Sequence, residues 1–375
     1  MRVVIASDKW KGSLSSRAVG EHIAAGLRKA MPGARPNVLS VADGGDGSVD
    51  AALAAGFDQR EMRVPDGRGA GYRCSTAWRG GDVVLEVAQL GGIARRSPDP
   101  LGASSHALGH ALRIAAARGA TRAFVGLGGS ASTDDGAGML QALGARLLDE
   151  TGHPLPPGGG ALARLATVDL EPITGIDGLE IVAARDVRNA LLGPDGAAHV
   201  FGPQKGATAR DVEVLEAGLT RWRDLTRIAR GGDVSALAGS GAAGGIGYGL
   251  LLLGARIVNG ADLFLDLIGF DEAVADADAV VTGEGRLDAQ SLGGKLPTVI
   301  ARRSRPRPVA AVVGSSALSA EQARQAGITD VTALDAVADP ARALGDPEYT
   351  GRIVELLAQQ LASRLAPPAG EVTTG

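Results

Sequence analysis

The segment DAVVTGEGRLD, residues 278–288, joins an apolar run to a dense group of charges. The run Ala279–Val281 is typical of a buried strand. The next seven residues contain two carboxylates, an arginine and two glycines. Charges placed directly after a buried strand indicate a turn at the carboxyl end of a sheet. This segment therefore predicts a sheet protein whose polar groups gather at that edge.

The same order of strand, polar loop and helix recurs along the chain. The strand RVVIA precedes a helical pattern at 13–31, where Val19, Ile23 and Leu27 repeat every four residues and Ser15 or Ser16 is the expected N-cap. Further strands are expected at 37–41, 122–127, 179–184, 308–314 and 330–334, and helices at 48–56, 104–119 and 209–230. This repetition predicts an α/β architecture with a mostly parallel sheet.

Residues 60–88 interrupt the alternation, because they read as consecutive strands joined by turns. No Pro/Ser-rich linker separates two halves of the chain, so we expect two interleaved domains. The expected first domain is discontinuous and comprises 1–60 plus 245–375. The expected second domain is inserted at 61–244, with approximate boundaries, and a disordered tail is expected at 366–375.

Composition excludes broad classes of function. The chain has 375 residues and a net charge of -4, which provides no basic field for nucleic acid. No run approaches the ~18–20 apolar residues that span a bilayer, and the N-terminal apolar run is too short for a signal peptide. The single cysteine, Cys74, excludes an internal disulfide and fits a reducing compartment. We therefore expect a cytoplasmic protein without nucleic-acid or membrane partners.

Polar clusters follow the expected strands at 7–12, 43–47, 128–136, 185–189, 282–288 and 314–316. Ligands of open α/β sheets bind at the carboxyl ends of strands, so we expect these clusters to line one active cleft. Many of them contain glycine, which permits positive φ and close approach of the backbone to a ligand. Acids, cations and glycines in this setting indicate the handling of phosphate and a divalent cation.

Magnesium usually takes one or two protein carboxylates, with phosphate oxygens and water completing its shell. The acids available to it are Asp8, Asp43, Asp46, Asp134, Asp135, Asp186, Glu284 and Asp288. Most of these must therefore act otherwise, as a base, a substrate ligand or a helix cap. For Asp46 and Asp135, N-capping is an equal alternative.

The cations available to meet anionic groups are Lys9, Lys11, Arg185, Lys205, Arg286 and Lys295. Arg286 is flanked by Glu284 and Asp288, so an internal ion pair is its alternative. Lys11 has solvation as its alternative, since lysine is mostly exposed in proteins.

Two glycine-rich loops, 126–138 and 239–247, precede helices whose N-terminal amides could bind phosphate. Neither loop contains G-x-x-x-x-G-K-[ST], and SDKWKG rather than a dinucleotide fingerprint follows the first strand. The stretch GSGAAGG at 239–245 matches G-x-G-x-x-G only loosely. It leaves open a nicotinamide-dependent oxidoreductase of a small hydroxy acid. A non-catalytic metabolite sensor is a further alternative.

The chain resembles the bacterial glycerate kinases of the tartronate-semialdehyde pathway type, from residue 1 to about 365. The landmarks are SDKWKGSLS at 7–15, VADGGDGSVDA at 41–51, GLGGSASTDDGAGMLQALGA at 126–145, FGPQKGA at 201–207, GAAGGIG at 241–247 and VTGEGRLDAQSLGGK at 281–295. The resemblance implies ATP-dependent phosphorylation of D-glycerate to 2-phosphoglycerate with Mg²⁺, and phosphorylation at the 3-hydroxyl stays open. It also implies a flavodoxin-like domain with a parallel sheet and a restriction-enzyme-like domain with a mixed sheet, with the cleft between them.

The resemblance also implies roles for individual residues. The expected catalytic residues are Asp8, Lys11, Asp186 and Arg286, with Asp8 or Asp186 as the base. The expected metal ligands are Asp186, Glu284 and Asp288. The residues expected to bind substrate or ATP are Asp43, Gly44, Gly128, Gly129, Ser130, Asp134, Lys205, Gly244, Gly245, Gly247 and Lys295. A homodimer is compatible with these features.

The sequence departs from the family's pattern at a few positions. Thr133 replaces an asparagine, Asp135 a glycine, Arg185 a cysteine and Ala190 a proline. These changes leave the reaction class intact and bear on how the substrate is held.

Overall fold

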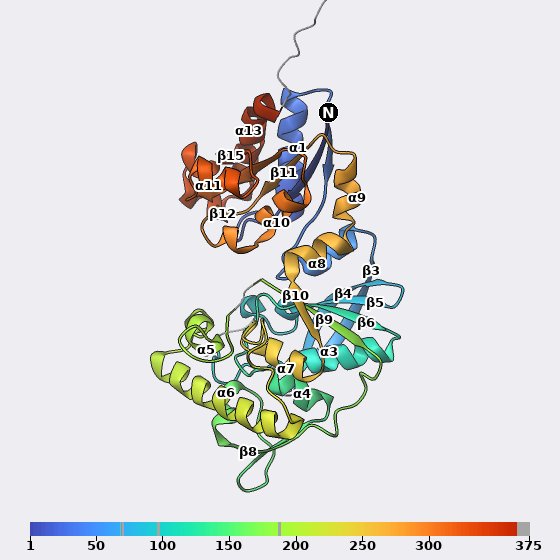
Figure 1. Ribbon diagram of the computed structural model, residues 1–375, viewed down its shortest axis with the longest axis vertical. Coiled ribbons are helices and arrows are strands. Elements are labelled where there is room, and N and C mark those ends of the chain that lie inside the picture. The colour runs from blue at the N-terminus through green and yellow to red at the C-terminus, as the bar shows by residue number, and fades with distance from the viewer. Residues whose placement is uncertain (68, 70, 96–97, 187–188, 366–375) are drawn as a thin grey trace, which may run out of the picture. The chain divides into compact units, whose positions relative to one another are not determined.

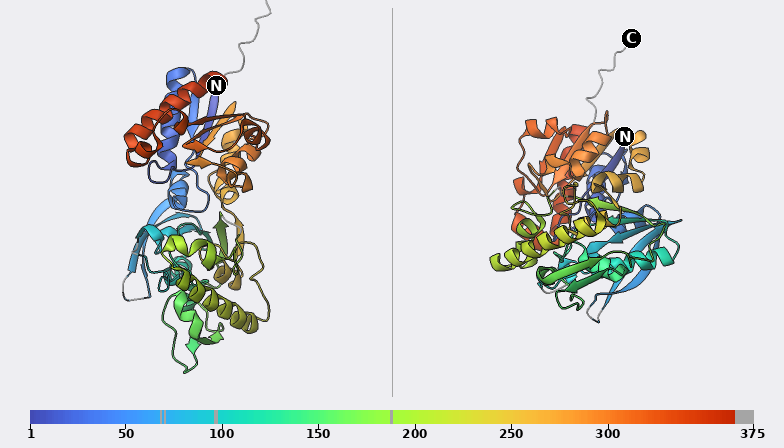
Figure 2. Two further views of the ribbon diagram at one scale, coloured as in Figure 1. Left: turned by 90° about the vertical axis from the view of Figure 1, so that its left-hand side faces the viewer. Right: turned by 60° about the horizontal axis from the view of Figure 1, so that its bottom comes forward.

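The computed structural model describes residues 1–67, 69, 71–95, 98–186 and 189–365 (Figure 1). The chain divides into two compact units. Unit 1 comprises Met1–Asp43 and Ala261–Gly375, and unit 2 comprises Gly44–Gly260. Both views of Figure 2 show the first and last parts of the chain, blue and red, in the same unit. The tail expected at 366–375 lies outside the described residues.

Unit 1 is built on a parallel sheet with the order β2-β1-β11-β13-β15. Its strands are β1 (Arg2–Ser7), β2 (Arg35–Val38), β11 (Ala279–Gly283), β13 (Val309–Val313) and β15 (Asp330–Ala333). Numbered along the chain within this unit, the order is 2-1-3-4-5, the flavodoxin-like arrangement. Strands β12 (Arg286–Leu287) and β14 (Ser315–Ser316) form a separate parallel pair.

The two faces of this sheet pack into two apolar layers, because successive side chains of a strand point to opposite faces. Val3 and Ile5 of β1 lie in one core cluster with α1 (Ser16–Ala30), α12 (Pro340–Gly345) and α13 (Pro347–Leu365). Val4 and Ala6 lie in the other, with α8 (Gly260–Leu267), α9 (Phe270–Ala275), α10 (Leu296–Arg303) and α11 (Ala320–Gln325). The short 3-10 helices are η5 (Ser291–Gly293) and η6 (Leu334–Ala336). Ser15 is the N-cap of α1, accepting from the amide of Ala18 at 3.2 Å.

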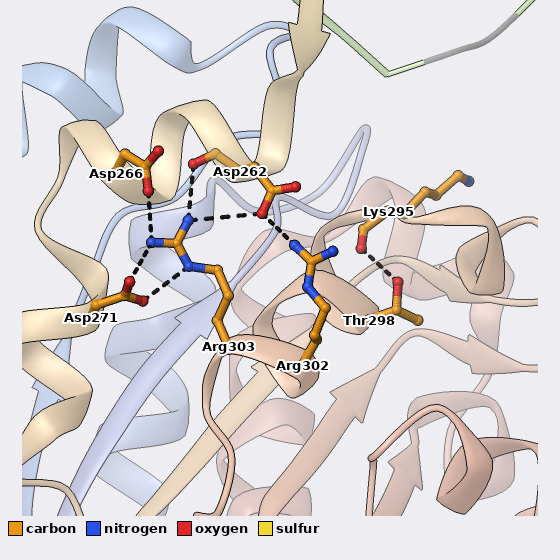
Figure 3. Close-up of polar contacts among 7 residues, drawn as sticks. All are labelled: Asp262, Asp266, Asp271, Lys295, Thr298, Arg302 and Arg303. Atoms are coloured by element: carbon orange, nitrogen blue, oxygen red, sulfur yellow. Dashed lines mark hydrogen bonds and ion pairs between the residues drawn. The ribbon is translucent and has the colours of Figure 1, made fainter.

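Arg303, the last residue of α10, ties this helix to α8 and α9 (Figure 3). Its guanidinium lies 2.7 Å from Asp266 and 2.8 Å from Asp271, and it donates to the carbonyl oxygen of Asp262 at 3.0 Å. The neighbouring Arg302 pairs with Asp262 alone among the carboxylates drawn in Figure 3. Three short helices are thus held together by one arginine.

Unit 2 contains a mixed sheet with the order β10-β9-β6-β5-β4-β3. Strands β5 (Asp82–Glu86), β6 (Arg122–Gly126), β9 (Glu180–Arg185) and β10 (Arg256–Asn259) run parallel, while β3 (Asp58–Pro65) and β4 (Gly71–Arg79) add an antiparallel hairpin. A second antiparallel pair consists of β7 (Arg146–Asp149) and β8 (Leu165–Asp169). The expected fold class, two interleaved α/β domains with one parallel and one mixed sheet, is confirmed.

The helices of unit 2 connect these strands and cover the sheet. They are α2 (Ser48–Ala54), α3 (His106–Ala117), α4 (Ala137–Leu143), α5 (Ala197–Phe201), α6 (Ala209–Arg230) and α7 (Ile246–Leu252), with 3-10 helices η1 (Val87–Gln89), η2 (Ile93–Arg95), η3 (Gly159–Arg164) and η4 (Pro203–Lys205). A capping box of Thr208 and Asp211 begins α6, and Gly231 in the left-handed conformation ends it. None of the helices in the described ranges has the length and apolar character that a bilayer crossing requires.

The observed division of the chain differs from the expected one. It falls at 43/44 and 260/261, whereas the sequence placed it at 60/61 and 244/245. Helix α2 belongs to unit 2 because it packs on β4 and β5, and β10 belongs there because it pairs with β9. Strand β2 also ends earlier than expected, since the amide of Val41 donates to the hydroxyl of Ser16 at 2.9 Å.

Candidate functional site

The carboxyl ends of β1 and β11 lie side by side in unit 1. Ser7 is paired with Gly283, and the amide of Asp8 donates to the carbonyl of Gly283 at 2.8 Å. Asp8 therefore follows β1 directly beside Glu284, which follows β11. In a 2-1-3-4-5 sheet, ligands bind at the carboxyl ends of these two strands. The connections that leave the two strands run over opposite faces of the sheet, which opens a crevice between them.

Burial perturbs the ionisation of both carboxyl groups. Burial raises the pKa of Asp8 to about 7, and the neighbouring Asp43 adds to this effect. Burial likewise raises the pKa of Glu284 to about 7, which Asp8 and Asp288 reinforce. The hydroxyl of Ser291 bonds to Glu284 and opposes the shift. These acids therefore titrate close to neutral pH.

The donor set at this edge suits a hard divalent cation. Glu284 is 6% exposed, and its Oε1 atom has no hydrogen-bond partner among the described residues. No group of three or more acidic, histidine or cysteine side chains in those ranges could hold a metal ion by itself. A magnesium ion taken up here would use one or two carboxylates, such as Glu284 and Asp288, together with phosphate and water.

The basic residues expected in unit 1 lie in different surroundings. Arg286 is 72% exposed and pairs with Asp288 at 3.3 Å, so its internal partner is Asp288 rather than Glu284. Lys11 is exposed. Lys295 precedes α10, and Figure 3 shows its side chain pointing away from Arg302 and Arg303.

Gly283, at the end of β11, and Gly314, directly after β13, allow neighbouring backbone segments to approach closely. A Cβ at Gly283 would lie 2.1 Å from the carbonyl oxygen of Val312. A Cβ at Gly314 would lie 2.4 Å from that of Gly285. Gly283 and Gly314 thus have a packing reason, whereas a Cβ at Gly285 would make only an ordinary contact with the Cα of Trp10, at 3.8 Å. For Gly285, approach of the backbone to a ligand stays the expected reason.

Unit 2 presents its own carboxyl edge at the ends of β5, β6 and β9. The amide of Gly128, after β6, donates to the carbonyl of Gly44 at 3.1 Å, and Gly44 packs on Ala184 of β9. Asp186 follows β9 and is exposed. Gly129 is exposed, whereas Ser130 is buried.

Glu86 is a buried acid at this edge that sequence reasoning missed. It ends β5 and accepts from the amides of Gly47 and Val49, each at 3.2 Å. Burial raises its pKa to about 7, and its side chain is hydrogen-bonded to that of Asp46. Gly47 is the N-cap of α2, so Asp46 does not cap that helix. The sequence signal that could have identified Glu86 is its place as an acid at the end of the apolar run VVLE.

The cluster after β6 is folded around buried charges. Asp134 and Asp135 have no exposed surface, and Lys205 is 5% exposed. The Oδ2 atom of Asp134 accepts from the amide of Ser105 at 2.8 Å, at the start of α3. The N-cap of α4 is Gly136, so Asp135 does not cap it.

The loop before α7 forms hydrogen bonds with its own backbone amides. Those of Gly245 and Gly247 donate to the carbonyl of Ala242, at 3.1 and 3.2 Å. Residues 231–245, all described, connect α6 to α7 without a strand. GSGAAGG thus lacks the strand that a dinucleotide fingerprint requires, which removes the basis for the oxidoreductase alternative.

The sequence placed its candidate residues in one cleft, and the structure describes two sets, one in each unit. The set in unit 1 is Asp8, Lys11, Asp43, Glu284, Arg286, Asp288 and Lys295. The set in unit 2 is Gly44, Gly128, Gly129, Ser130, Asp134, Asp186, Lys205, Gly244, Gly245 and Gly247.

Comparison with known proteins gives consistent results. Residues 3–365 match the model of the glycerate kinase family. A glycerate kinase of Bacillus subtilis (strain 168) is 37% identical, covering 97% of this chain and 98% of its own. A glycerate 2-kinase of Escherichia coli (strain K12) is 36% identical over 84% of this chain and 85% of its own. A crystal structure assigned as glycerate kinase 2 from Salmonella typhimurium LT2 superposes with a TM-score of 0.81 at 34% identity, covering 97% of this chain and 98% of that one.

Proposed function

The chain belongs to the glycerate kinase family, and from this premise we propose that it transfers the γ-phosphoryl group of ATP to the 2-hydroxyl of D-glycerate. The observation that carries the proposal is a pair of carboxyl groups, Asp8 and Glu284, at the ends of β1 and β11. Each has its pKa raised to about 7. Phosphoryl transfer of this kind depends on positioning and on stabilising charge, so an acid edge beside exposed cations supports it.

We assign the base to Asp8 rather than Asp186. A general base works best when its pKa lies near the working pH, and burial places that of Asp8 at about 7. Asp186 is an exposed residue of unit 2. Asp8 would accept the proton of the glycerate 2-hydroxyl as that oxygen attacks phosphorus, and ADP would leave from the opposite side.

The remaining groups hold the anionic partners. Lys11 and Arg286 are exposed cations that would hold the glycerate carboxylate or the transferring phosphoryl group. Glu284 and Asp288 would hold Mg²⁺, and Asp186 stays a further candidate for this role. Magnesium, when bound, would neutralise charge on the β- and γ-phosphates. The loop at Gly128–Ser130 would bind phosphate, as we expected from the sequence. The cytoplasmic location and the homodimer stay predictions.

The test is an ADP-coupled assay with D-glycerate, ATP and MgCl₂, followed by separation of 2- from 3-phosphoglycerate. We expect glycerate-dependent ADP release and the 2-phospho product. The absence of such release would overturn the proposal. A 3-phospho product would overturn only the position of transfer.

A further inference from the structure

Lys205 is a buried residue of unit 2 at the end of η4. Its ammonium donates to the Oγ of Ser130 at 3.2 Å, the carbonyl oxygen of Ser132 at 2.5 Å and the Oγ1 of Thr133 at 3.4 Å. An ammonium group has three N–H donors, so these contacts use all of them. The acceptors all belong to one segment, which we name the serine loop (Ser130–Asp135).

The serine loop packs against a second segment, which we name the glycine loop (Gly244–Gly247). The amide of Asp135 donates to the carbonyl of Gly244 at 3.1 Å. A Cβ at Gly244 would lie 2.0 Å from the Ser132 oxygen and 2.6 Å from the Lys205 nitrogen. A Cβ at Gly245 would lie 1.7 Å from Asp135 Oδ1. Glycine is therefore required where the two loops meet around Lys205.

Charge explains why a lysine occupies this position. Burial lowers the pKa of Lys205 to about 8, and the charges of Asp134 and Asp135, both fully buried, oppose this effect and favour the charged form. Removing the lysine would leave buried carboxyl groups without a cation, which is unfavourable. The Oδ2 atom of Asp134 also accepts from the amide of Gly138 at 3.3 Å, and so connects the loop to α4. Lys205 thus holds together a cluster that reaches two helices.

We propose that Lys205 is a positioning residue, which fixes the serine loop and the glycine loop in one arrangement and does not itself contact ATP. The proposal replaces the expectation that Lys205 binds the nucleotide directly. A lysine that binds phosphate does so as a point charge and must present its ammonium to the ligand. Here that group is enclosed by protein acceptors. The consequence for catalysis rests on the proposed function, in which the segment Gly128–Ser130 holds phosphate.

Hydrogen exchange on the ligand-free enzyme tests the positioning role directly. We expect Lys205→Met to accelerate exchange at Asp135 and Gly245 by about tenfold or more, because their bonded amides would open locally. Lys29→Met is the matched control, since Lys29 lies in unit 1 with 60% of its side chain exposed. Unchanged exchange in both loops of Lys205→Met would overturn the proposal.

A second measurement uses the wild-type enzyme and needs no variant to fold. The chain has five lysines, Lys9, Lys11, Lys29, Lys205 and Lys295. Acetylation followed by mass spectrometry should modify Lys205 far more slowly than Lys29, equally with and without MgATP. Rapid modification of Lys205 that MgATP suppresses would show direct contact and overturn the proposal.

Kinetics separates positioning from a general loss of structure. We expect Lys205→Met to raise the KM for ATP by about tenfold or more, since misplaced binding groups are costly, and to leave the KM for D-glycerate within about twofold. A smaller folded fraction would lower the apparent kcat and move neither KM, and that outcome would count against the proposal. If the wild-type enzyme made no ADP, the proposed function would fail, while exchange and acetylation would still decide the role of Lys205.

Discussion

Asp8 follows the carboxyl end of β1, where burial and the nearby Asp43 carboxylate raise its pKa to about 7. A carboxyl group with this pKa is half ionised near neutral pH. Its environment therefore connects one residue to the pH dependence of the reaction.

We expect Asp8→Asn to lower kcat by about 10²–10⁴, the range for loss of a general base. In the wild type, kcat/KM for D-glycerate should rise with pH until about 7, because only the ionised Asp8 accepts a proton. The variant should lose that ionisation. Initial rates between pH 5.5 and 9 measure both effects.

The controls for this prediction are Asp276→Asn and Asp186→Asn. Asp276 is an exposed residue of unit 1 that pairs with Arg2, so its variant should keep the wild-type profile. If Asp186→Asn lost the rising limb and Asp8→Asn kept it, the base would be Asp186.

For single residues, the sequence predicted where the candidate side chains lie better than it predicted which groups surround them. It placed Asp8 and Glu284 at strand ends because the apolar runs before them are unambiguous. It could not predict that Arg286 pairs with Asp288, since the path of the turn decides which carboxylate comes within reach. It missed Glu86 because the partners of that acid lie in a segment nearly forty residues earlier.

The helices α8, α9 and α10 show how an element is held by a single side chain. Arg303 is 13% exposed and reaches carboxylates on both α8 and α9 (Figure 3). Arg302, one residue earlier, is 61% exposed. The two arginines are thus a matched pair that differ in burial and in number of partners.

We expect Arg303→Met to lower the free energy of unfolding by about 1–3 kcal/mol, the range for breaking a partly buried network. Arg302→Met should cost less than about 1 kcal/mol, as exposed pairs do. Urea unfolding of both variants measures the difference. Equal decreases in the free energy of unfolding would show that the burial of Arg303 does not strengthen its ion pairs.

Long elements were more predictable than short ones. The bounds of α6, 209–230, were predicted correctly because its apolar positions repeat over six turns and its cap residues are typical. The short strands β7, β8 and β10 and the helices α8 and α9 were not assigned. A few residues carry too little periodicity, and the pairing of β10 with β9 depends on contacts across more than seventy residues.

On the scale of the whole molecule, the alternation of strands and helices predicted two α/β units, while their boundaries depended on tertiary contacts. The glycine-rich segment 43–47 looks like a loop within one domain, yet the division of the chain falls inside it. The position of this boundary depends on the packing of α2 on the sheet of unit 2, which a local sequence pattern cannot show.

The pH dependence of stability should reflect the buried acids, and Glu284→Gln isolates one of them. As pH rises from about 4.5 to about 7, unfolded Glu284 releases its proton before the folded group does, so the contribution of Glu284 to wild-type stability falls. The variant cannot titrate there. Its stability relative to wild type should therefore grow by up to about 1.4 kcal/mol per pH unit in this window and level off above it.

Urea unfolding at pH 5, 6, 7 and 8 measures this difference. Adding MgCl₂ at pH 7 should stabilise the wild type more than the variant, because a bound ion stabilises only the folded state that retains its ligand. NaCl at matched ionic strength is the control. A difference independent of pH would contradict the burial assigned to Glu284.

The discontinuity of unit 1 has a consequence for how the protein is made. Strand β1 pairs with β11, which is translated only after all of unit 2. At about 5–20 residues per second, the nascent β1–α1–β2 segment waits on the order of ten seconds or longer for its central partner. Unit 2 is continuous from Gly44 to Gly260 and has its own core, so it is complete first. During that interval the apolar faces of β1 and α1 are the surfaces that a ribosome-associated chaperone would cover.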